Sequence, residues 1–506
     1  MEAFLQPLQG LAEFEEIKKR CGANRGILNV SGCMESQKVH LMYGLSGLFP
    51  CHLILADDER NAKEIYEDYR FYDKNVYFYP AKDLLFFQAD IHGNLLIRQR
   101  MRVIRALLEQ EEVTVVTSID GCMDFLMPLE KIKSSLLHFK SDSVIDLDQL
   151  KADLVDLGYE RAGQVELPGQ FSVRGGIIDI YPLTEENPWR IELWDDEIDS
   201  IRSFDAESQR SLENIDEITI YPATEKMDSE DMVSFLDYFP EEKTLLFLDE
   251  LNHLAENGEG VEEEYRQSRM HREEKGEANL PEQWLCGFQE VQKKLNRRNC
   301  VAVSALSPRR SGWKINEEFD LTVKSVDSYN SSFELLVKDL LQYKSQGYRI
   351  ALLSGSRTRA ERLAKDLSEE GLNAFYSQDT DRIISPGEIM VVYGHARRGF
   401  QYPLIKFAVM TETDIFGKEQ KKRKKKKKYS GNRIQDFAEL SIGDLVVHEK
   451  HGLGIYRGIE KVEVDRVVKD YIKIEYRGGS NLYILATQLD ALQKYSGSSD
   501  NAKTPK

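Results

Sequence analysis

Residues 51–56 read CHLILA and residues 113–117 read VTVVT, two apolar runs of strand length. Between them, Ala62, Ile65 and Tyr69 recur at the spacing of an amphipathic helix. Strands that alternate with amphipathic helices build a parallel sheet with helices on its faces. This stretch therefore predicts an α/β fold.

The composition is that of a large globular protein. The chain has 506 residues, 41% of them hydrophobic, which predicts several domains. A net charge of −18 argues against nucleic-acid binding by most of the surface. Six cysteines without a CxxC pair, no apolar N-terminal segment and no apolar run of membrane-spanning length predict a cytoplasmic protein that does not bind membranes.

Changes in texture along the chain predict a multidomain α/β architecture. Short strands with frequent glycines interrupt the first α/β domain, which predicts an inserted α+β module, and a basic run separates a second α/β domain from a glycine-rich all-β end. The expected parts are a motor-like α/β domain at 1–144 and 223–332, the inserted module at 145–222, a second α/β domain at 333–417, a basic linker at 418–438, a small all-β barrel at 439–496 and a tail at 497–506.

The first strand is followed by a damaged phosphate-binding motif. A P-loop has the pattern GxxxxGK[ST], in which glycines admit the phosphates, lysine contacts them and the hydroxyl binds Mg²⁺. Here Gly32 and Lys38 keep the spacing, but Gln37 replaces the second glycine and Val39 replaces the hydroxyl. Valine cannot bind a metal, so the motif predicts a degenerate nucleotide site.

A second motor-like signal lies downstream. The apolar strand at 244–248 ends in Asp249 and Glu250, as in a Walker B strand, although acids at a strand end are common. Because two required positions of the P-loop are wrong, we predict no catalytic residues, no cofactor and no ATP hydrolysis for this chain.

The most specific motifs are GYER at 158–161, GQFSVRGGIIDIYP at 169–182 and RIELWDDEIDSI at 190–201. They resemble a module that UvrB shares with the bacterial transcription-repair coupling factors, in which it docks UvrA. Near the C-terminus, HGLGIY at 451–456 resembles the RNA-polymerase-interacting domain of the same factors, a Tudor-like barrel also found in CarD-type regulators.

This resemblance implies the N-terminal portion of a coupling factor. Such a chain would bind stalled RNA polymerase through its β subunit and recruit UvrA in nucleotide-excision repair of DNA damage. The ATP- and Mg-dependent DNA translocase, a helicase-like motor, would lie beyond Lys506. The alternatives are a UvrB-like ATP-dependent repair helicase subunit, which the damaged P-loop disfavours, and a CarD-type transcription regulator, which leaves the first half without a role.

Within the UvrA-docking module, the resemblance places Arg174, Arg190 and Trp194 at the binding surface, with Arg161 as a weaker addition. Strand spacing puts Arg190 and Trp194 on one side of a sheet. Arginine and tryptophan also dominate the energetics of many interfaces. The competing interpretation is that these are ordinary surface arginines beside acids.

In the all-β domain, the resemblance implies that Ile459, Lys461 and Val462 lie in an edge strand, 458–464, which pairs with the polymerase β subunit. The competing interpretation places Ile459 and Val462 in the core. In the linker, Lys424, Lys425 and Lys426 belong to a basic run that is mainly a solvated spacer, with weak, salt-sensitive DNA binding as the alternative. No metal site is predicted, since the two histidines at 448 and 451 lack ligand spacing.

Overall fold

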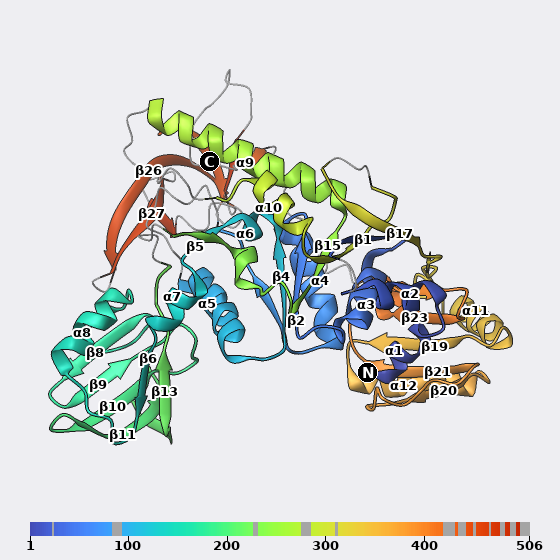
Figure 1. Cartoon of the computed structure of the whole chain (residues 1–506), viewed down its shortest axis with the longest axis horizontal. Helices are drawn as coiled ribbons and strands as arrows, with labels where there is room; N and C mark the ends of the chain where they lie inside the picture. The colour runs from blue at the N-terminus through green and yellow to red at the C-terminus, as the bar shows by residue number, and fades with distance from the viewer. Residues whose placement is uncertain are drawn as a thin grey trace. The chain divides into compact units, whose positions relative to one another are not determined.

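The fold was analysed in a computed structural model of the chain (Figure 1). It describes residues 1–22, 25–82, 94–225, 231–274, 285–308, 312–417, 431–433, 442–448, 452–464, 467–475, 481–485 and 492–495. These residues fall into two compact units, divided close to residue 419, and each unit is described here by itself.

A seven-stranded parallel sheet forms the centre of the first unit. Its order is β17 (Ile315–Asp320), β1 (Gly26–Ser31), β16 (Asn299–Val303), β15 (Thr244–Asp249), β2 (Cys51–Ala56), β4 (Val113–Ser118) and β3 (Val76–Tyr79). The chain segments that connect or flank these strands form the helices α1 (Glu2–Leu8), α2 (Ala12–Arg20), α3 (Glu35–Ser46), α4 (Glu59–Tyr72), α5 (Asn94–Glu109), α9 (Leu251–Glu274) and α10 (Phe288–Leu295). The predicted α/β fold is confirmed.

The chain leaves this sheet after β4 and returns to it in β15. Both strands pair in parallel with β2, so everything between Ser118 and Thr244 is an insertion into one continuous sheet. The bounds of 145–222 for the inserted module stay a prediction. Small elements lie at its start and end: α6 (Ile119–Met123), β5 (Phe125–Leu126), α7 (Leu129–Ser134), β14 (Val233–Ser234) and the 3-10 helix η2 (Phe235–Tyr238).

The inserted module is built on a six-stranded sheet. Its order is β12 (Ser211–Asn214), β11 (Glu197–Phe204), β10 (Trp189–Trp194), β9 (Ile177–Ile180), β8 (Gln170–Arg174) and β7 (Glu160–Arg161). A ribbon of β6 (Leu137–Lys140) and β13 (Glu217–Ile220) and the helix α8 (Leu147–Asp156) complete it. Alternate strand residues such as Phe171, Ile178 and Ile191 are fully buried on one face, which makes that face the core side.

A buried arginine fastens the module to the parent domain. Arg100 in α5 is fully buried, donates to Asp124 at 2.6 Å and pairs with Glu225, the last described residue of the module. Its guanidinium also lies 4.2 Å from the ring centre of Tyr79. A buried charge is tolerated only when it is paired, so this cluster fixes the segment that follows β13 against α5.

A second α/β sheet belongs to the same compact unit. Its order is β18 (Lys324–Ser325), β22 (Phe400–Tyr402), β23 (Phe407–Thr411), β19 (Arg349–Ser354), β21 (Glu388–Tyr393) and β20 (Asn373–Tyr376), with helices α11 (Phe333–Ser345), α12 (Arg357–Glu369) and α13 (Glu412–Phe416). One face packs against α11 and α12, whereas the other shares a core with α1, α3 and α4.

The second unit is a six-stranded antiparallel sheet. Its order is β24 (Gly431–Arg433), β29 (Leu492–Tyr495), β25 (Leu445–His448), β26 (Gly452–Val464), β27 (Val467–Glu475) and β28 (Asn481–Leu485). The predicted all-β texture is confirmed. In the part of the chain that the structure describes, no helix is long and apolar enough to cross a membrane.

Candidate docking face and nucleotide-like site

The sheet of the inserted module presents a polar face opposite its core. Strand pairing sets Arg190 opposite Asp179, and Arg174 opposite Ile177, two residues away on the same face. Trp194 lies four residues beyond Arg190 along β10. Because side chains alternate in a strand, the two arginines and the tryptophan share one face, as the sequence spacing predicted.

Asp179 holds both arginines. Arg190 makes a two-pronged pair with it, Nε to Oδ1 at 2.7 Å and Nη2 to Oδ2 at 2.9 Å, and Arg174 donates to Oδ2 at 2.6 Å. Arg190 is 15% exposed and its guanidinium lies 4.4 Å from the ring centre of Phe204. The hydrogen bonds that Arg190 donates to Asp179 raise the pKa of Arg190. Asp179 therefore already occupies the two-pronged geometry through which the Arg190 guanidinium could bind a partner's carboxylate.

Trp194 is the most accessible large side chain of this face. It is 80% exposed at the end of β10, where a tight turn with Asp195 at a φ of +60° leads into β11. A hollow of about 480 Å³ lies beside this turn, lined among others by Val144, Gly175 and Leu193. Val144 is itself 70% exposed, so a second exposed apolar side chain lies near the turn, beside the acidic residues Asp195 and Asp196.

Arg161 lies elsewhere in the module. Its partner in the β7–β8 pairing is Phe171, which points to the core face, so Arg161 does not share a face with Arg174. It is an exposed residue on the edge strand of the sheet. The structure thus brings together three of the four predicted docking residues.

The backbone N–H groups of the loop after β1 are hydrogen-bonded to other groups of the chain. The N–H groups of Gly32, Cys33 and Met34 donate to the carbonyls of Ala305 and Ser304 and to the side chain of Gln37. In a working P-loop these groups would cradle phosphate oxygens. Here the short loop has no unpaired donors at these three positions.

Lys38 is likewise occupied. Its Nζ lies 2.7 Å from Asp249 Oδ1 and 2.5 Å from Glu250 Oε1, and Asn61 donates to the second oxygen of Asp249 at 2.7 Å. Burial opposes the charge of Lys38, but the two carboxylates raise its pKa above the ordinary value. Lys38 thus forms ion pairs with both members of the acidic pair and neutralises acids of its own chain.

The two substituted positions are buried. Val39 and Gln37 are fully inaccessible, and Gln37 donates to the hydroxyl of Tyr402 at 3.0 Å. A side chain at Gly32, whose φ is +77°, would clash with the carbonyl oxygen of Leu321. Among the residues that the structure describes, no group of three or more His, Cys, Asp or Glu side chains is arranged to hold a metal ion.

The long strand β26 has two different environments. Its first residues, 452–455, pair with β25 on one side, while β27 pairs along the other side from 455 to 464. In the described sheet, residues 458–464 therefore pair on one side only. Ile459 is 44% exposed, whereas the side chains of Lys461 and Val462 lie outside the described residues.

Comparison with known proteins agrees with this organisation. The model of the UvrB interaction domain matches residues 137–225, and that of the CarD-like/TRCF RID domain matches residues 440–496. A transcription-repair-coupling factor of Bacillus subtilis (strain 168) is 30% identical over 94% of the chain. That of Staphylococcus aureus (strain MRSA252) is 28% identical over 86% of it. The chain is a homologue of the transcription-repair-coupling factors.

The match covers part of each relative. The chain spans 46% of the Bacillus coupling factor and 42% of the Staphylococcus coupling factor, somewhat less than half of their lengths. The match to the UvrB interaction domain includes Arg161, Arg174, Arg190 and Trp194, and the match to the CarD-like/TRCF RID domain includes residues 458–464. Lys424, Lys425 and Lys426 belong to neither match and lie outside the described residues.

Sequence reasoning missed two features of this coupling-factor homologue. One is Asp179, which fixes the geometry of both arginines and is fully buried. Its position in the apolar run IIDIYP was a usable signal, since an acid in a buried strand needs a cationic partner. The other is the Arg100 cluster, for which the sequence carries no local signal because its partners come from distant segments.

Proposed function

We propose that this chain acts in transcription-coupled nucleotide-excision repair, docking UvrA through the inserted module and RNA polymerase through the all-β unit. The observation that carries this proposal is the pair of matched domains on one chain, together with an exposed aromatic residue on the outer face of the first. In the intact protein, an ATP-dependent DNA translocase would act on the polymerase.

In this proposal the residues of the docking face have different roles. Trp194, at 80% exposure, and Arg174, at 45%, make the contact with UvrA. Arg190 is a positioning residue, because its guanidinium is bound to Asp179 and stacked on Phe204. Its loss would leave the buried carboxylate of Asp179 with Arg174 as its one remaining arginine partner and would distort the strand that carries Trp194.

Titration of purified UvrA against the chain tests the proposal. Trp194→Ala and Arg174→Ala should each cost roughly 2 kcal/mol, about thirtyfold in affinity, with an unchanged circular dichroism spectrum. Val155→Ala is the matched control, since Val155 is 57% exposed on α8 of the same module and should not affect binding. Equal affinity of the wild type and both variants would refute the assignment of this face.

We infer that the first domain descends from a P-loop motor and no longer hydrolyses ATP or binds Mg. The support for this is the occupied set of loop N–H groups and the Lys38–Asp249–Glu250 cluster, which fill the place of phosphate and metal. The chain would then need no cofactor of its own.

For the all-β unit, we propose a small closed Tudor-like barrel whose 458–464 segment adds a strand to the polymerase β subunit. The one-sided pairing of this segment supports the proposal, since an unpaired strand edge offers backbone hydrogen bonds to a partner. Specificity for this partner would come from the side chains of Ile459, Lys461 and Val462. The lysines at 424–426 would add a weak DNA contact that salt removes.

A further inference from the structure

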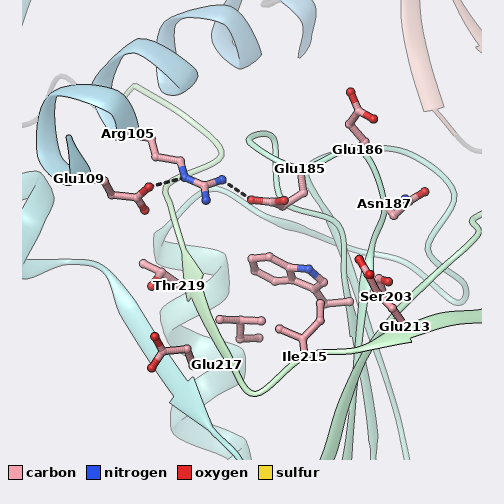
Figure 2. A pocket seen from close by; sticks show the side chains of 12 residues that line it. Arg105, Glu109, Glu185, Glu186, Asn187, Ser203, Glu213, Ile215, Glu217 and Thr219 are labelled. Carbon is pink, nitrogen blue, oxygen red and sulfur yellow. Dashed lines mark hydrogen bonds and ion pairs between the residues drawn. The ribbon is translucent and has the colours of Figure 1, made fainter. Parts of the chain in front are cut away.

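A cavity of about 600 Å³ opens where the inserted module meets α5 (Figure 2). Arg105 and Glu109 lie on one side of it, and Asn187, Ser203 and Glu213 lie on the other (Figure 2). Trp189 also lines it, and this residue alternates with Arg190 along β10. The cavity therefore belongs to the opposite face of the sheet from the docking face and is a separate feature.

The lining of the cavity is strongly acidic. Five carboxylates and one guanidinium line it: Glu109, Glu185, Glu186, Glu213, Glu217 and Arg105. The guanidinium of Arg105 already neutralises two of these carboxylates, because it pairs with Glu109 at 2.8 Å and with Glu185. Among the described residues, the carboxylates of Glu186 and Glu213 have no ion-pair partner, so the cavity retains an unbalanced negative charge.

A buried hydroxyl supplies an independent sign of a missing ligand. Ser203 is 4% exposed and lines the cavity, yet its Oγ has no hydrogen-bond partner within the described part of the chain. Buried polar groups are nearly always paired, so an unpaired hydroxyl at a cavity wall points to a donor from outside. Trp189, at 7% exposure, and Ile215 offer apolar surface next to it, which suits the alkyl stem of a long cationic side chain.

The edge of the sheet runs beside this cavity. β12, which carries Glu213, is the terminal strand of the six-stranded sheet, and all four of its residues are exposed. It pairs with β11 alone, so its outer backbone edge is open in the described structure. An open edge can accept an extended peptide as an additional strand.

We propose that this cavity and the β12 edge bind an extended basic segment of a partner protein, which pairs with β12 and inserts a lysine or arginine side chain between the carboxylates. The cationic head group donates to Glu213, Glu186 and Ser203 Oγ, and its alkyl stem lies along Trp189. This surface would act in addition to the proposed UvrA-docking face.

A direct binding measurement tests this. The probe is a fluorescein-labelled octapeptide of alternating lysine and threonine, titrated with the whole chain at low salt and followed by anisotropy. The double variant Glu186→Gln/Glu213→Gln should bind about tenfold more weakly, and Ser203→Ala about fivefold more weakly. Glu207→Gln is the matched control, since Glu207 is an exposed acid of the same module that does not line the cavity.

Three further arms decide the chemistry. The lysine-acetylated peptide should not bind, because acetylation removes the charge, and a peptide N-methylated at alternate residues should bind weakly, because it cannot pair with β12. Equal binding of all chain variants, or of the acetylated peptide, would overturn the site. Spermine that binds with the same dependence on Glu213 and displaces the peptide would assign the cavity to a free polyamine and overturn the partner-segment proposal. Retained UvrA binding by the double variant separates this result from the proposed docking function.

Discussion

Lys38 and Arg190 are two cations that form ion pairs with carboxylates of their own chain. Lys38 stands where a phosphate-binding lysine is expected, but it is 11% exposed and bound to Asp249 and Glu250. Arg190 stands where a docking arginine is expected, but Asp179 binds it. In both places a carboxylate of the chain itself neutralises the cation, which gives the cation a structural role.

This assigns a stability effect to Lys38. Lys38→Ala leaves Asp249, at 3% exposure, without its cation, which should lower the free energy of unfolding by about 3 kcal/mol. It should leave ATP hydrolysis at the background level of the wild type. Urea unfolding and a steady-state hydrolysis assay measure the two effects.

Lys365→Ala is the matched control for this experiment, because Lys365 is 77% exposed on α12 and should change neither quantity. ATP turnover by the wild type that Lys38→Ala abolishes would contradict the proposed loss of the nucleotide site. Turnover that survives in Lys38→Ala would have to come from another source.

The residue scale also marks a limit of sequence reasoning. The Lys38–Asp249 pair was predictable because a P-loop lysine and a Walker B acid meet at the carboxyl edge of one sheet. The ion pair between Asp179 and Arg190 could not be predicted, because it depends on the register between β9 and β10. A shift of one residue would have sent one of the two side chains to the opposite face.

At the scale of elements, α3 connects parts that are distant in the sequence. Its His40 is fully buried. The Nε2 atom of His40 donates to the carbonyl oxygen of Phe4 at 2.9 Å, and Nδ1 is hydrogen-bonded to the hydroxyl of Tyr402 at 3.1 Å. One helix thus contacts α1 on one side and β22 of the second α/β sheet on another. Burial lowers the pKa of His40 to about 4, although the hydrogen bond with Phe4 acts in the opposite direction.

This burial makes stability depend on pH. The unfolded chain binds a proton at His40 below about pH 6.5, whereas the folded chain does so only below about pH 4. The stabilising contribution is complete above pH 6.5 and is lost as the pH falls towards 4. Between pH 7.5 and pH 5 the loss from this group is about 2 kcal/mol.

His40→Gln provides the measurement, because glutamine keeps hydrogen-bonding capacity but does not titrate. Urea unfolding at pH 7.5 and pH 5 should give a difference in unfolding free energy about 2 kcal/mol smaller in this variant than in the wild type. His253→Gln is the control, since His253 is 58% exposed on α9 and should leave the pH dependence unchanged. An identical pH dependence in wild type and His40→Gln would show that His40 does not titrate as proposed.

Apolar patterning decided which elements could be predicted. β2, β4 and β15 are largely apolar runs and appear where the sequence placed them. β12 could not be predicted, because all its residues are exposed and no alternation marks it. α9 is also highly charged, so no apolar periodicity marks it as a helix.

At the scale of the molecule, the second α/β sheet is part of the first compact unit. Ala351, Leu353 and Met390 on its strands belong to the same hydrophobic core as Met42 in α3 and Tyr69 in α4. The sequence suggested a separate domain at 333–417, because each half shows its own alternation of strands and helices. Periodicity reports local elements, and it carries no information about whether two sheets share a core.

A core shared by two sheets implies that they unfold together, and Arg397 tests this. Its Nε lies 3.1 Å from Asp68 Oδ2 and its backbone N–H donates to Asp68 Oδ1 at 3.0 Å, while its guanidinium also pairs with Glu64. Asp68 is 1% exposed, so Arg397→Ala leaves a buried carboxylate without its cation. The free energy of unfolding should fall by about 3 kcal/mol. Because the core is shared, hydrogen exchange should accelerate together in β2 and in β19, which lie in different sheets.

Native-state hydrogen exchange with peptide-level mass spectrometry resolves both strands in one experiment. Arg362→Ala is the matched control, since Arg362 is 83% exposed on α12 and its loss should change neither strand. Faster exchange of β19 with unchanged protection of β2 would mean that the second sheet opens alone. In that case residues 333–417 would be an independent domain held by the surface of α4, and the shared core would not be cooperative.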